Sequence, residues 1–221
     1  MKILDMVLAR VAPHECVGCE AEGTLLCGDC RSGLPRSVER CYRCHKLSKG
    51  GRTCASCRSS SKLHSVRALT GYEGSAESLV WRLKFHGARS AAAEMAELMD
   101  QCLELPADVL IVPVPTATSR VRTRGYDQAQ LLAWELSRHA SIPYMSVLRR
   151  LGQHRQVGAS RRERLSQLEK AFRVTSPQRI KERHVVLVDD VVTTGATLAA
   201  AAKVLKAAGA KRVSAVVFAQ A

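Results

Sequence analysis

Aromatic side chains are scarce in this 221-residue chain, where phenylalanine, tryptophan and tyrosine make up 4% of the residues. Few aromatics leave few platforms on which the bases of a single strand could stack. No apolar run approaches the length of a membrane span, and Asp5 and Arg10 interrupt the opening MKILDMVLARVAP. We therefore expect no membrane insertion and no secretory signal peptide. The opening predicts an amphipathic helix instead, and we expect a cytoplasmic protein.

Several catalytic signatures are also missing. The chain has no G-x-x-x-x-G-K-[ST] loop and no G-x-G-x-x-G after a strand, which excludes the common ATPase and dinucleotide-binding motifs. No Ser/His/Asp hydrolytic constellation is visible. Acidic residues are few, because 20 Asp and Glu stand against 34 Lys and Arg and leave a net charge of +14. Such a charge favours partners that carry phosphate without identifying one.

Cysteine, in contrast, is abundant and regularly spaced. Eight of the nine cysteines form four C-x-x-C pairs: Cys16 and Cys19, Cys27 and Cys30, Cys41 and Cys44, Cys54 and Cys57. Without an expected secretion signal disulfides are disfavoured, whereas two thiolates of one tight turn can grip a tetrahedral zinc ion. We expect two structural Zn²⁺ sites, each with four thiolates, and favour sequential pairing over an interleaved arrangement. Zinc binding, worth about 10–16 kcal/mol per site in small peptides, would largely fold this region.

Two further features of the cysteines need an interpretation. CYRCH, residues 41–45, formally matches the attachment motif for c-type haem, but that chemistry requires export, so zinc is favoured. His45 is then expected to be an exposed neighbour. The ninth cysteine, Cys102, lies in the helical stretch AAAEMAELMDQCLEL and is expected to be a buried structural thiol.

The composition changes after Cys57, at RSSSKLHS, which predicts a small module at 1–62 and a second domain at 63–221. In the second domain, strands and helices alternate, which predicts an α/β fold with a parallel sheet and helices on both faces. The expected strands are 66–72, 108–115, 145–148, 171–174, 185–190 and 211–219. The expected helices are 75–87, 91–103, 127–139 and 196–209, with a charged loop and a short helix before residue 171. Ligands of such folds gather at the carboxyl ends of the strands.

One segment, VVLVDDVVTTGATL at 185–198, places two acids at the end of a buried strand. Asp189 and Asp190 repel each other, so a cation or a group rich in hydroxyls is expected in front of them. The helix that begins after Gly195 presents unpaired backbone N–H groups, and the threonines of 193–197 add hydroxyl donors, so a phosphate fits there. The carboxylates would accept hydrogen bonds from sugar hydroxyls or contact a divalent ion through water. The segment therefore predicts a site for a ribose 5-phosphate; an acidic strand end that caps a helix is the structural alternative.

This segment resembles the phosphoribosyl pyrophosphate (PRPP) binding signature of type I phosphoribosyltransferases. From Cys16 onward, the chain is similar to the ComF (ComFC) family of competence proteins. The four cysteine pairs are followed by Tyr72 with LVWRLKFHG, then IVPVP, RTRGYDQAQLLA, RQVGASRRERLSQLEKAF and the signature. The resemblance implies a type I phosphoribosyltransferase fold behind a small N-terminal zinc-ribbon module. It also implies binding of PRPP with Mg²⁺ and a role in DNA uptake during natural transformation.

The resemblance implies roles for individual residues as well. The carboxylates become ligands of the ribose, and the segment after them becomes the loop that holds the 5-phosphate: Asp189, Asp190, Val191, Val192, Thr193, Thr194, Gly195, Ala196 and Thr197. The pyrophosphate and its magnesium fall to the segment that includes Pro113, Val114, Pro115 and Arg124. Asp127 and Gln167 stand where the family has asparagine. Asp127 adds a negative charge where the polyphosphate should lie, or faces the magnesium instead.

The stretch 149–164 holds six arginines and one acid. In phosphoribosyltransferases a mobile loop at this place closes over PRPP, and Arg161 and Arg164 are our choices for its catalytic contacts, because guanidinium groups grip phosphate oxygens bidentately. A solvated basic loop is the alternative. Lys84, in RLKFHG, is another candidate for the anion, or is simply exposed on its helix.

Two functions from different classes stay open at this point. In the first, the protein is an enzyme that displaces magnesium pyrophosphate from C1 of the ribose with an unidentified nucleophile. In the second, the domain senses PRPP or only retains the pocket. Its basic surface and zinc ribbons then contact single-stranded DNA. The family's competence role also implies the helicase machinery of DNA uptake as a partner. Neither the acceptor nor the oligomeric state follows from the sequence.

Overall fold

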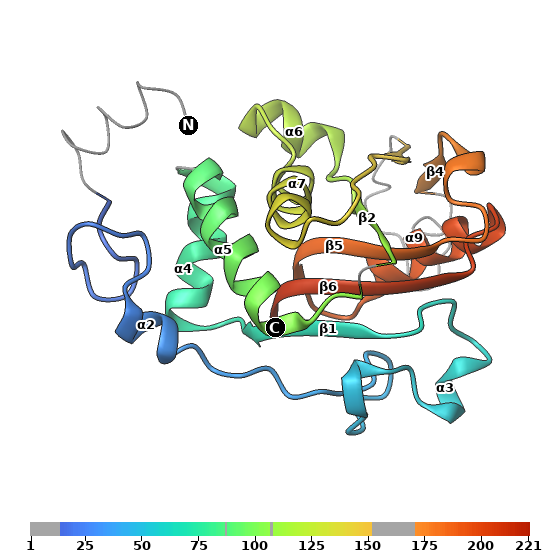
Figure 1. Ribbon diagram of the computed structural model, residues 1–221, viewed down its shortest axis with the longest axis horizontal. Helices are drawn as coiled ribbons and strands as arrows, with labels where there is room; N and C mark the ends of the chain where they lie inside the picture. The colour runs from blue at the N-terminus through green and yellow to red at the C-terminus, as the bar shows by residue number, and fades with distance from the viewer. Residues whose placement is uncertain (1–13, 87, 107, 152–170) are drawn as a thin grey trace, which may run out of the picture.

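A four-stranded parallel sheet organises the computed structural model, which describes residues 14–86, 88–106, 108–151 and 171–221 (Figure 1). Its order is β1-β6-β5-β2, and each pair of neighbours is parallel. The strands are β1 (Val66–Gly71), β2 (Leu110–Pro113), β5 (His184–Val192) and β6 (Arg212–Gln220). The two central strands are near-continuous apolar runs, as expected for strands covered on both faces.

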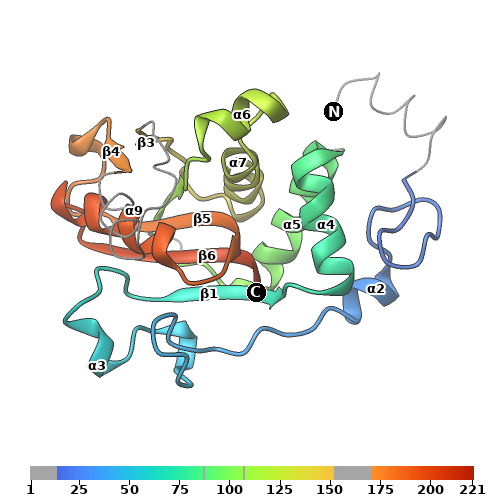
Figure 2. The ribbon, with the colours of Figure 1, turned by 180° about the vertical axis from the view of Figure 1, so that it is seen from behind.

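Helices cover both faces of this sheet, as the sequence predicts. The helices concerned are α4 (Gly74–Phe85), α5 (Ala88–Leu103), α7 (Gln128–Ala140) and α9 (Ala196–Ala207). The first three share one core with Val186 and Val188, whereas α9 shares a second core with Val185 and Leu187, because alternate residues of β5 point to opposite faces. Figure 2, seen from behind, brings the α9 face forward. None of the helices in the described ranges is long and apolar enough to cross a bilayer.

Two expected strands do not join the parallel sheet. β3 (Leu148–Arg150) and β4 (Phe172–Val174) pair antiparallel in a separate ribbon. Both are short and alternate buried with exposed residues, a pattern that suits a ribbon covered on one face only. Tyr144, the residue before the expected strand 145–148, makes one isolated parallel bridge to Ile111 of β2. The sequence interpretation thus placed these segments in the wrong sheet.

Two other expectations are corrected. No helix was expected between Pro115 and Asp127, but this segment contains α6 (Thr118–Arg124), which ends at Gly125 with a φ of 79°. Cys102 is exposed rather than buried, because it lies on the outer side of α5 while its neighbour Leu103 faces the core. The opening helix and residues Arg161, Arg164 and Gln167 lie outside the described residues.

The cysteine-rich segment runs along the edge of the sheet, beside β1 (Figure 1). It contains α2 (Gly28–Ser32), the 3₁₀ turn η1 (Lys49–Gly51) and α3 (Ala55–Arg58). Single antiparallel bridges join Arg36 to Thr70 and Arg52 to Ser65, so backbone groups of the β1 edge are partly paired.

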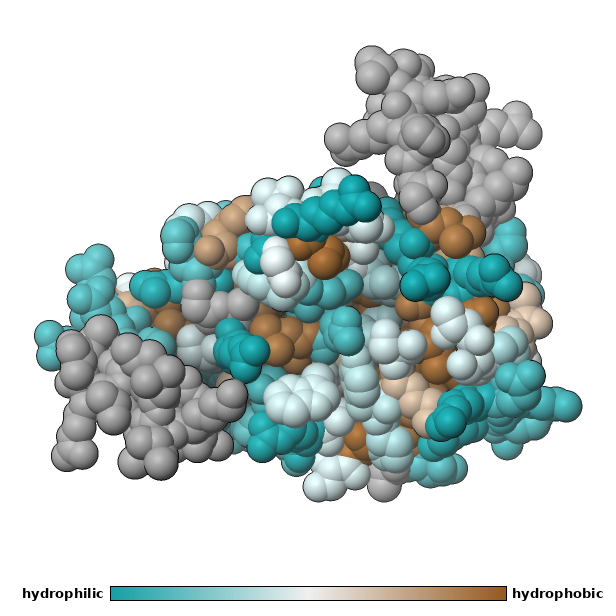
Figure 3. Space-filling model, turned by 90° about the horizontal axis from the view of Figure 1, so that it is seen from above, coloured by the Kyte–Doolittle hydropathy of each residue, from teal (hydrophilic) through white to brown (hydrophobic). Residues whose placement is uncertain are grey.

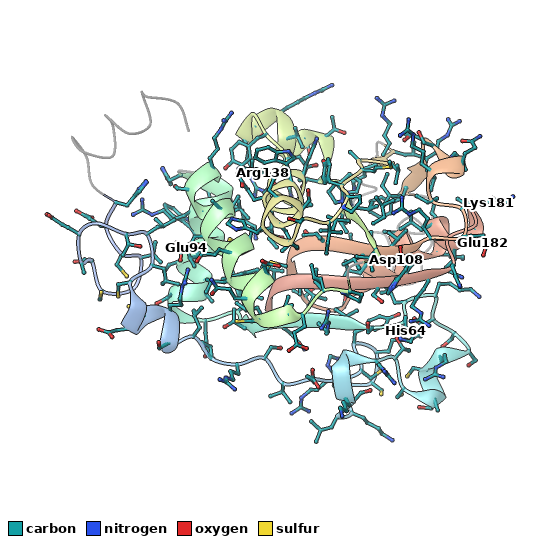
Figure 4. All side chains as sticks on the ribbon, in the orientation of Figure 1. His64, Glu94, Asp108, Arg138, Lys181 and Glu182 are labelled. Carbon is teal, nitrogen blue, oxygen red and sulfur yellow. The ribbon has the colours of Figure 1, made fainter. Side chains whose placement is uncertain are left out.

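The first cysteine group consists of Cys16, Cys19, Cys27 and Cys30, and an ion pair beside it joins it to the helical layer. Arg31 of α2 contacts Glu94, labelled on α5 in Figure 4, with Nη2 and Oε1 separated by 2.9 Å. A boundary near residue 62 stays a prediction.

Candidate functional site

The acidic pair of β5 lines a cavity at the carboxyl ends of β2 and β5. Its volume is about 350 Å³, within the usual range for small-molecule sites. The residues that line it come from segments far apart in the chain: Tyr72, Lys84, Val114, Pro115, Thr116, Ala117, Arg120, Gln128, Arg150, Asp189, Asp190, Val191, Thr193, Thr197 and Ala221. Eight of the residues assigned from the sequence are therefore together in one cavity. Arg161 and Arg164 cannot be placed, since they lie outside the described ranges.

The other assigned residues lie beside this cavity rather than on its wall. Val192 is buried in the second core, and the turn 194–196 leads into α9. Pro113 lines a neighbouring cavity that extends towards β3, and Arg124 lines another between α4 and α6.

The two carboxylates are held close together, and one ammonium group is in contact with them. Asp190 is 6% exposed, and the Nζ atom of Lys84 lies 2.9 Å from its Oδ2 atom, in ion-pair contact but without the alignment of a hydrogen bond. The backbone N–H of Asp190 donates to Oδ1 of Asp189 at 3.0 Å. Burial raises the pKa of Asp189 well above its usual value, and the negative charge of Asp190 raises it further. Such a pair attracts hydroxyl donors or a divalent cation.

Lys84 enters the cavity from the last turn of α4. Of the two possibilities that the sequence left open, the geometry favours the site, because the Lys84 side chain is 23% exposed and its ammonium faces Asp190. A lysine here supplies the point charge that the buried acid needs, and it stands beside any anion that enters the cavity.

The turn after the acids opens the start of α9 to an anion. Gly195 is the N-cap residue, with a φ of 69° and no side chain of its own, and the Thr194 hydroxyl accepts a hydrogen bond of 3.4 Å from the backbone N–H of Ala196. The first N–H groups of a helix have no internal partners and carry partial positive charge, so they suit a phosphate. Thr193 and Thr197 place hydroxyl groups on the cavity wall next to this turn.

Asp127, the departure from the family's asparagine, has a structural role that sequence reasoning missed. Its Oδ1 accepts hydrogen bonds from the backbone N–H groups of Ala129 and Gln130 at the start of α7 and from the Thr116 hydroxyl. Its Oδ2 accepts from the backbone N–H of Thr116 at 2.9 Å. The carboxylate therefore caps α7 and ties the loop after β2 to it. An acidic residue directly before a helical pattern was the signal for this cap.

Three polar residues of the cavity were not singled out from the sequence. Gln128 is 4% exposed, and its Oε1 atom is buried without a hydrogen-bond partner. Arg120 reaches the wall from α6 and Arg150 from β3, where burial lowers the pKa of the Arg150 guanidinium. Together with Lys84 they bring three cations to a cavity that also holds two acids, which suits a ligand with anionic and hydroxyl groups.

A second cavity, also of about 350 Å³, adjoins the first and shares Lys84 and Arg120 with it. It lies between α4 and α6, where Phe85 is 54% exposed and the Arg124 guanidinium stands 5.0 Å from the centre of its ring. The Nη1 atom of Arg124 is buried without a partner. Trp81, one turn before Phe85, is 50% exposed. Aromatic and basic side chains thus adjoin the acidic cavity, even though aromatics are rare in the chain.

Apolar side chains reach the surface on this side of the molecule only in separate patches. Figure 3, seen from above, shows brown areas divided by hydrophilic residues rather than one continuous apolar face. Separate patches of this kind are ordinary for a protein surface, so the aromatic and basic side chains described above are distinguished by their chemistry and not by their hydropathy.

The eight paired cysteines gather in two groups, Cys16, Cys19, Cys27 and Cys30, then Cys41, Cys44, Cys54 and Cys57. The sequential pairing is thus confirmed. All sulfur atoms of a group lie within 4.8 Å of one another, and the sulfur atoms of Cys19 and Cys27, like those of Cys44 and Cys54, are 3.5 Å apart. A tetrahedral zinc with bonds of ~2.3 Å spaces its sulfurs by about 3.8 Å. Both groups therefore fit zinc.

One thiol of each group has a pKa lowered to about 6, whereas hydrogen bonds from the neighbouring thiols Cys27 and Cys54 raise the pKa of Cys30 and of Cys57. Burial raises the pKa of Cys16, but N–H groups of the backbone, that of Cys27 first among them, outweigh it and lower the pKa to about 6. The Ser56 hydroxyl is the main cause that lowers the pKa of Cys54 to about 6. Thiolates that are stabilised in this way are the form that binds metal.

Comparison with known proteins adds a family to this geometry. The family description "Phosphoribosyl transferase domain" matches residues 121–221. Competence protein F of Haemophilus influenzae is 30% identical over 200 residues, which span 85% of this chain and 87% of that protein. Competence protein ComFC of Streptococcus pneumoniae is 29% identical, over 87% of this chain and 86% of that protein. DNA utilization protein YhgH of Escherichia coli is 36% identical over 61% of this chain and 63% of that protein.

Proposed function

The chain belongs to the competence protein F (ComFC) family and contains a phosphoribosyltransferase domain, and from that premise we propose that it binds PRPP with Mg²⁺ in the cavity at the end of β5. The observation that carries the proposal is the adjacent pair Asp189 and Asp190, half-buried and buried respectively, shortly before the N-cap glycine of α9. The acids would hold the ribose hydroxyls, and the N–H groups at the start of α9 would hold the 5-phosphate. Free anions alone would not favour a wall that carries two acids, whereas a sugar phosphate matches both halves of the site.

The basic part of the cavity wall suits the pyrophosphate of the same ligand. Lys84, Arg120 and Arg150 line it, and the loop at Thr116 is fixed by Asp127. Carboxylate oxygens are ligands that Mg²⁺ prefers, so Asp189 and Asp190 would also hold the ion directly or through water. Bound Mg²⁺ would neutralise charge on the pyrophosphate.

The reaction that this arrangement supports is the transfer of phosphoribose. The bond between C1 and the pyrophosphate oxygen breaks, its electron pair leaves with the pyrophosphate, and a nucleophile that loses a proton forms the new bond to C1. The basic side chains lie where negative charge develops on the leaving group, and fixed cations there stabilise the transition state without reorganisation. We assign the acceptor to the adjoining cavity between α4 and α6, which shares Lys84 and Arg120 with the first.

The test of PRPP binding is the double substitution Asp189→Asn with Asp190→Asn. We expect it to abolish heat release on titration with PRPP and Mg²⁺, while circular dichroism and metal content stay as in the wild type. Asp100→Asn with Asp108→Asn removes two acids elsewhere on the chain and serves as the control. Unchanged affinity in the first variant would refute the assignment. Transfer itself is tested by a screen of amines and bases for pyrophosphate release that requires both PRPP and the acceptor.

A second function, contact with single-stranded DNA, is favoured by one observation on the α4–α6 face. Trp81 and Phe85 are exposed with ring centres 5.8 Å apart, and Arg124 stands over Phe85. Exposed rings beside arginines can stack bases and pair with phosphates. The names of the relatives, competence protein and DNA utilization protein, support a role in DNA uptake.

Binding of a fluorescent oligothymidine, followed by anisotropy, tests this second function. We expect Trp81→Ala with Phe85→Ala to weaken binding about tenfold or more, since each stacked base contributes roughly 1–3 kcal/mol. Trp134→Ala removes an exposed ring that lines neither cavity and is the control. Affinity in the wild type should fall steeply with added salt, because phosphate contacts release counterions. Equal affinities in all three proteins would exclude the face as the DNA site.

A further inference from the structure

Tyr42 links the second cysteine group to the body of the protein. It follows Cys41 directly and lies in the same turn as Cys44, yet its side chain is only 8% exposed and belongs to the core on the α9 face. Its hydroxyl group shares a hydrogen bond of 2.7 Å with the Ser61 hydroxyl. A metal-binding turn does not itself require a large buried ring, so the contacts of the Tyr42 side chain indicate its role.

The ring of Tyr42 lies against Gly195, the N-cap residue of α9. A Cβ atom added to Gly195 would be 2.5 Å from Cδ2 of Tyr42 and 3.2 Å from Cε2, which is closer than real side chains approach. The glycine is therefore in direct contact with the Cδ2–Cε2 edge of the ring. Gly195 also adopts a φ of +69°, a conformation that glycine tolerates best. The ring thus forms the outer wall of the turn to which we assign the 5-phosphate.

We propose that Tyr42 is a positioning residue for this turn, and that the second cysteine group and the phosphate turn bind their ligands cooperatively. The inference rests on the proposed function, because it takes the turn at Gly195 as the phosphate site. A metal ion that joins Cys41 and Cys44 to Cys54 and Cys57 fixes the backbone on which the ring is carried. With the ring fixed, the turn keeps the conformation that presents its N–H groups.

Thermodynamic linkage makes the effect reciprocal. If the metal at this group tightens phosphate binding, then bound phosphate must tighten the metal by the same factor. The coupling has a short physical path, from the Cys41–Cys44 turn through the Tyr42 ring to Gly195, and needs no rearrangement of the sheet.

The first cysteine group provides an internal comparison, because it docks elsewhere. Its turn at Gly18 contacts the Ser75 side chain at the start of α4, and Arg31 pairs with Glu94 and Glu97 of α5. Among the described residues, no hydrogen bond or ion pair joins this group to the turn at Gly195. We therefore expect the coupling to be confined to one of the two metals.

The test compares Tyr42→Leu, which removes the ring, with Tyr42→Phe, which keeps it and loses only the hydrogen bond to Ser61. Ribose 5-phosphate is the probe, measured by titration calorimetry on the zinc-loaded protein. We expect Tyr42→Leu to weaken its binding about tenfold, within the range of ordinary coupling between sites, and Tyr42→Phe to stay close to the wild type. Leu205→Ala creates a defect in the same core at the far end of α9 and should lower stability without changing affinity.

A second readout follows zinc rather than the sugar phosphate. Zinc release to a chromophoric chelator should be slowed by ribose 5-phosphate in one of two phases for the wild type, and in neither phase for Tyr42→Leu. If Tyr42→Leu does not fold, zinc release from the wild-type protein alone tests the coupling. A release rate that ribose 5-phosphate does not change would overturn it.

The two proposals fail in different ways. A wild-type protein that binds no ribose 5-phosphate overturns the proposed function and the coupling together. Wild-type binding with equal affinity in Tyr42→Leu, and with equal zinc release, overturns the coupling alone and leaves the phosphate site in place.

Discussion

Replacement of Lys84 by methionine should destabilise the protein in a way that depends on pH. Methionine keeps much of the length and apolar stem of lysine but removes the charge that faces Asp190. Asp190 is nearly fully buried and next to Asp189, so the variant leaves two acids without the cation that balances them. The uncompensated charge, rather than a lost hydrogen bond, is the expected cause of the loss.

The magnitude follows from the separation of the charges. At 2.9 Å and an effective dielectric constant of about 20, Coulomb attraction is about 6 kcal/mol, an upper limit because removal from water costs both ions. Loss of one partner of a buried pair costs about 3–5 kcal/mol. Since the lysine side chain is 23% exposed, we expect the lower end, about 3 kcal/mol. For a chain of this size that lowers the melting temperature by roughly 6–12 °C.

The sign of the pH dependence follows from Asp189. Burial, aided by the charge of Asp190, raises the pKa of Asp189 in the folded protein above its value in the unfolded chain. Between these two pKa values the folded state binds more protons than the unfolded state, so stability falls as pH rises through that window. Without Lys84 the acids are more strongly repelled, and the deficit of the variant should grow from mildly acidic to neutral pH.

Urea denaturation at several pH values between about 4.5 and 7.5 measures this deficit. Arg82→Met, two residues earlier on α4, removes a cation that forms no ion pair with the described part of the chain and serves as the control. Equal unfolding free energies for wild type and Lys84→Met at neutral pH would refute the reasoning. So would a deficit that stays constant across the range, since it would indicate lost packing rather than charge.

Three further outcomes are expected. Elemental analysis should find two zinc ions per chain, and one or none would contradict the two-site assignment. Gly195→Ala should weaken ribose 5-phosphate binding at least tenfold and cost about 1–3 kcal/mol of stability, because it combines a positive φ with a clash against Tyr42. Wild-type affinity in this variant would contradict the contact between Tyr42 and the phosphate turn. Asp127→Ala should cost about 1–2 kcal/mol in urea denaturation through loss of the α7 cap, and an unchanged midpoint would show that the cap contributes nothing.

The elements with strong periodicity could be predicted from the sequence. Val185–Val188 is a continuous apolar run with turn residues after it, and DQAQLLAWELSRH repeats apolar residues at helical spacing, so β5 and α7 appear close to where they were expected. The acids at the strand end and the glycine before the helix were placed by the same local pattern. Cysteine spacing predicted which thiols share a turn, because each pair closes a turn by itself, but it only favoured the sequential grouping of the pairs that the structure shows.

Segments without a local pattern were misplaced. TSRVRTR of α6 has a single apolar residue, Val121, so its helical form rests on contacts with its surroundings and on a stop at Gly125 rather than on an apolar face. LRR and FRV of β3 and β4 are too short for their pattern to reveal which sheet they join. Cys102 was taken as buried because its neighbours are apolar, but residues adjacent on a helix point in different directions.

The walls of the site depend on contacts that no local pattern contains. Arg120, Gln128 and Arg150 come from three elements and meet only because α6, α7 and β3 fold around the end of β2. Tyr42 reaches Gly195 from the opposite end of the chain, and the motif around each residue explains only its own half of the contact. A cysteine pair needs no tyrosine between its thiols, and a phosphate turn needs no ring outside it. Because Tyr42 and the phosphate turn are in contact, we assign the metal-binding turn a second role, which is to position the turn of the ligand site.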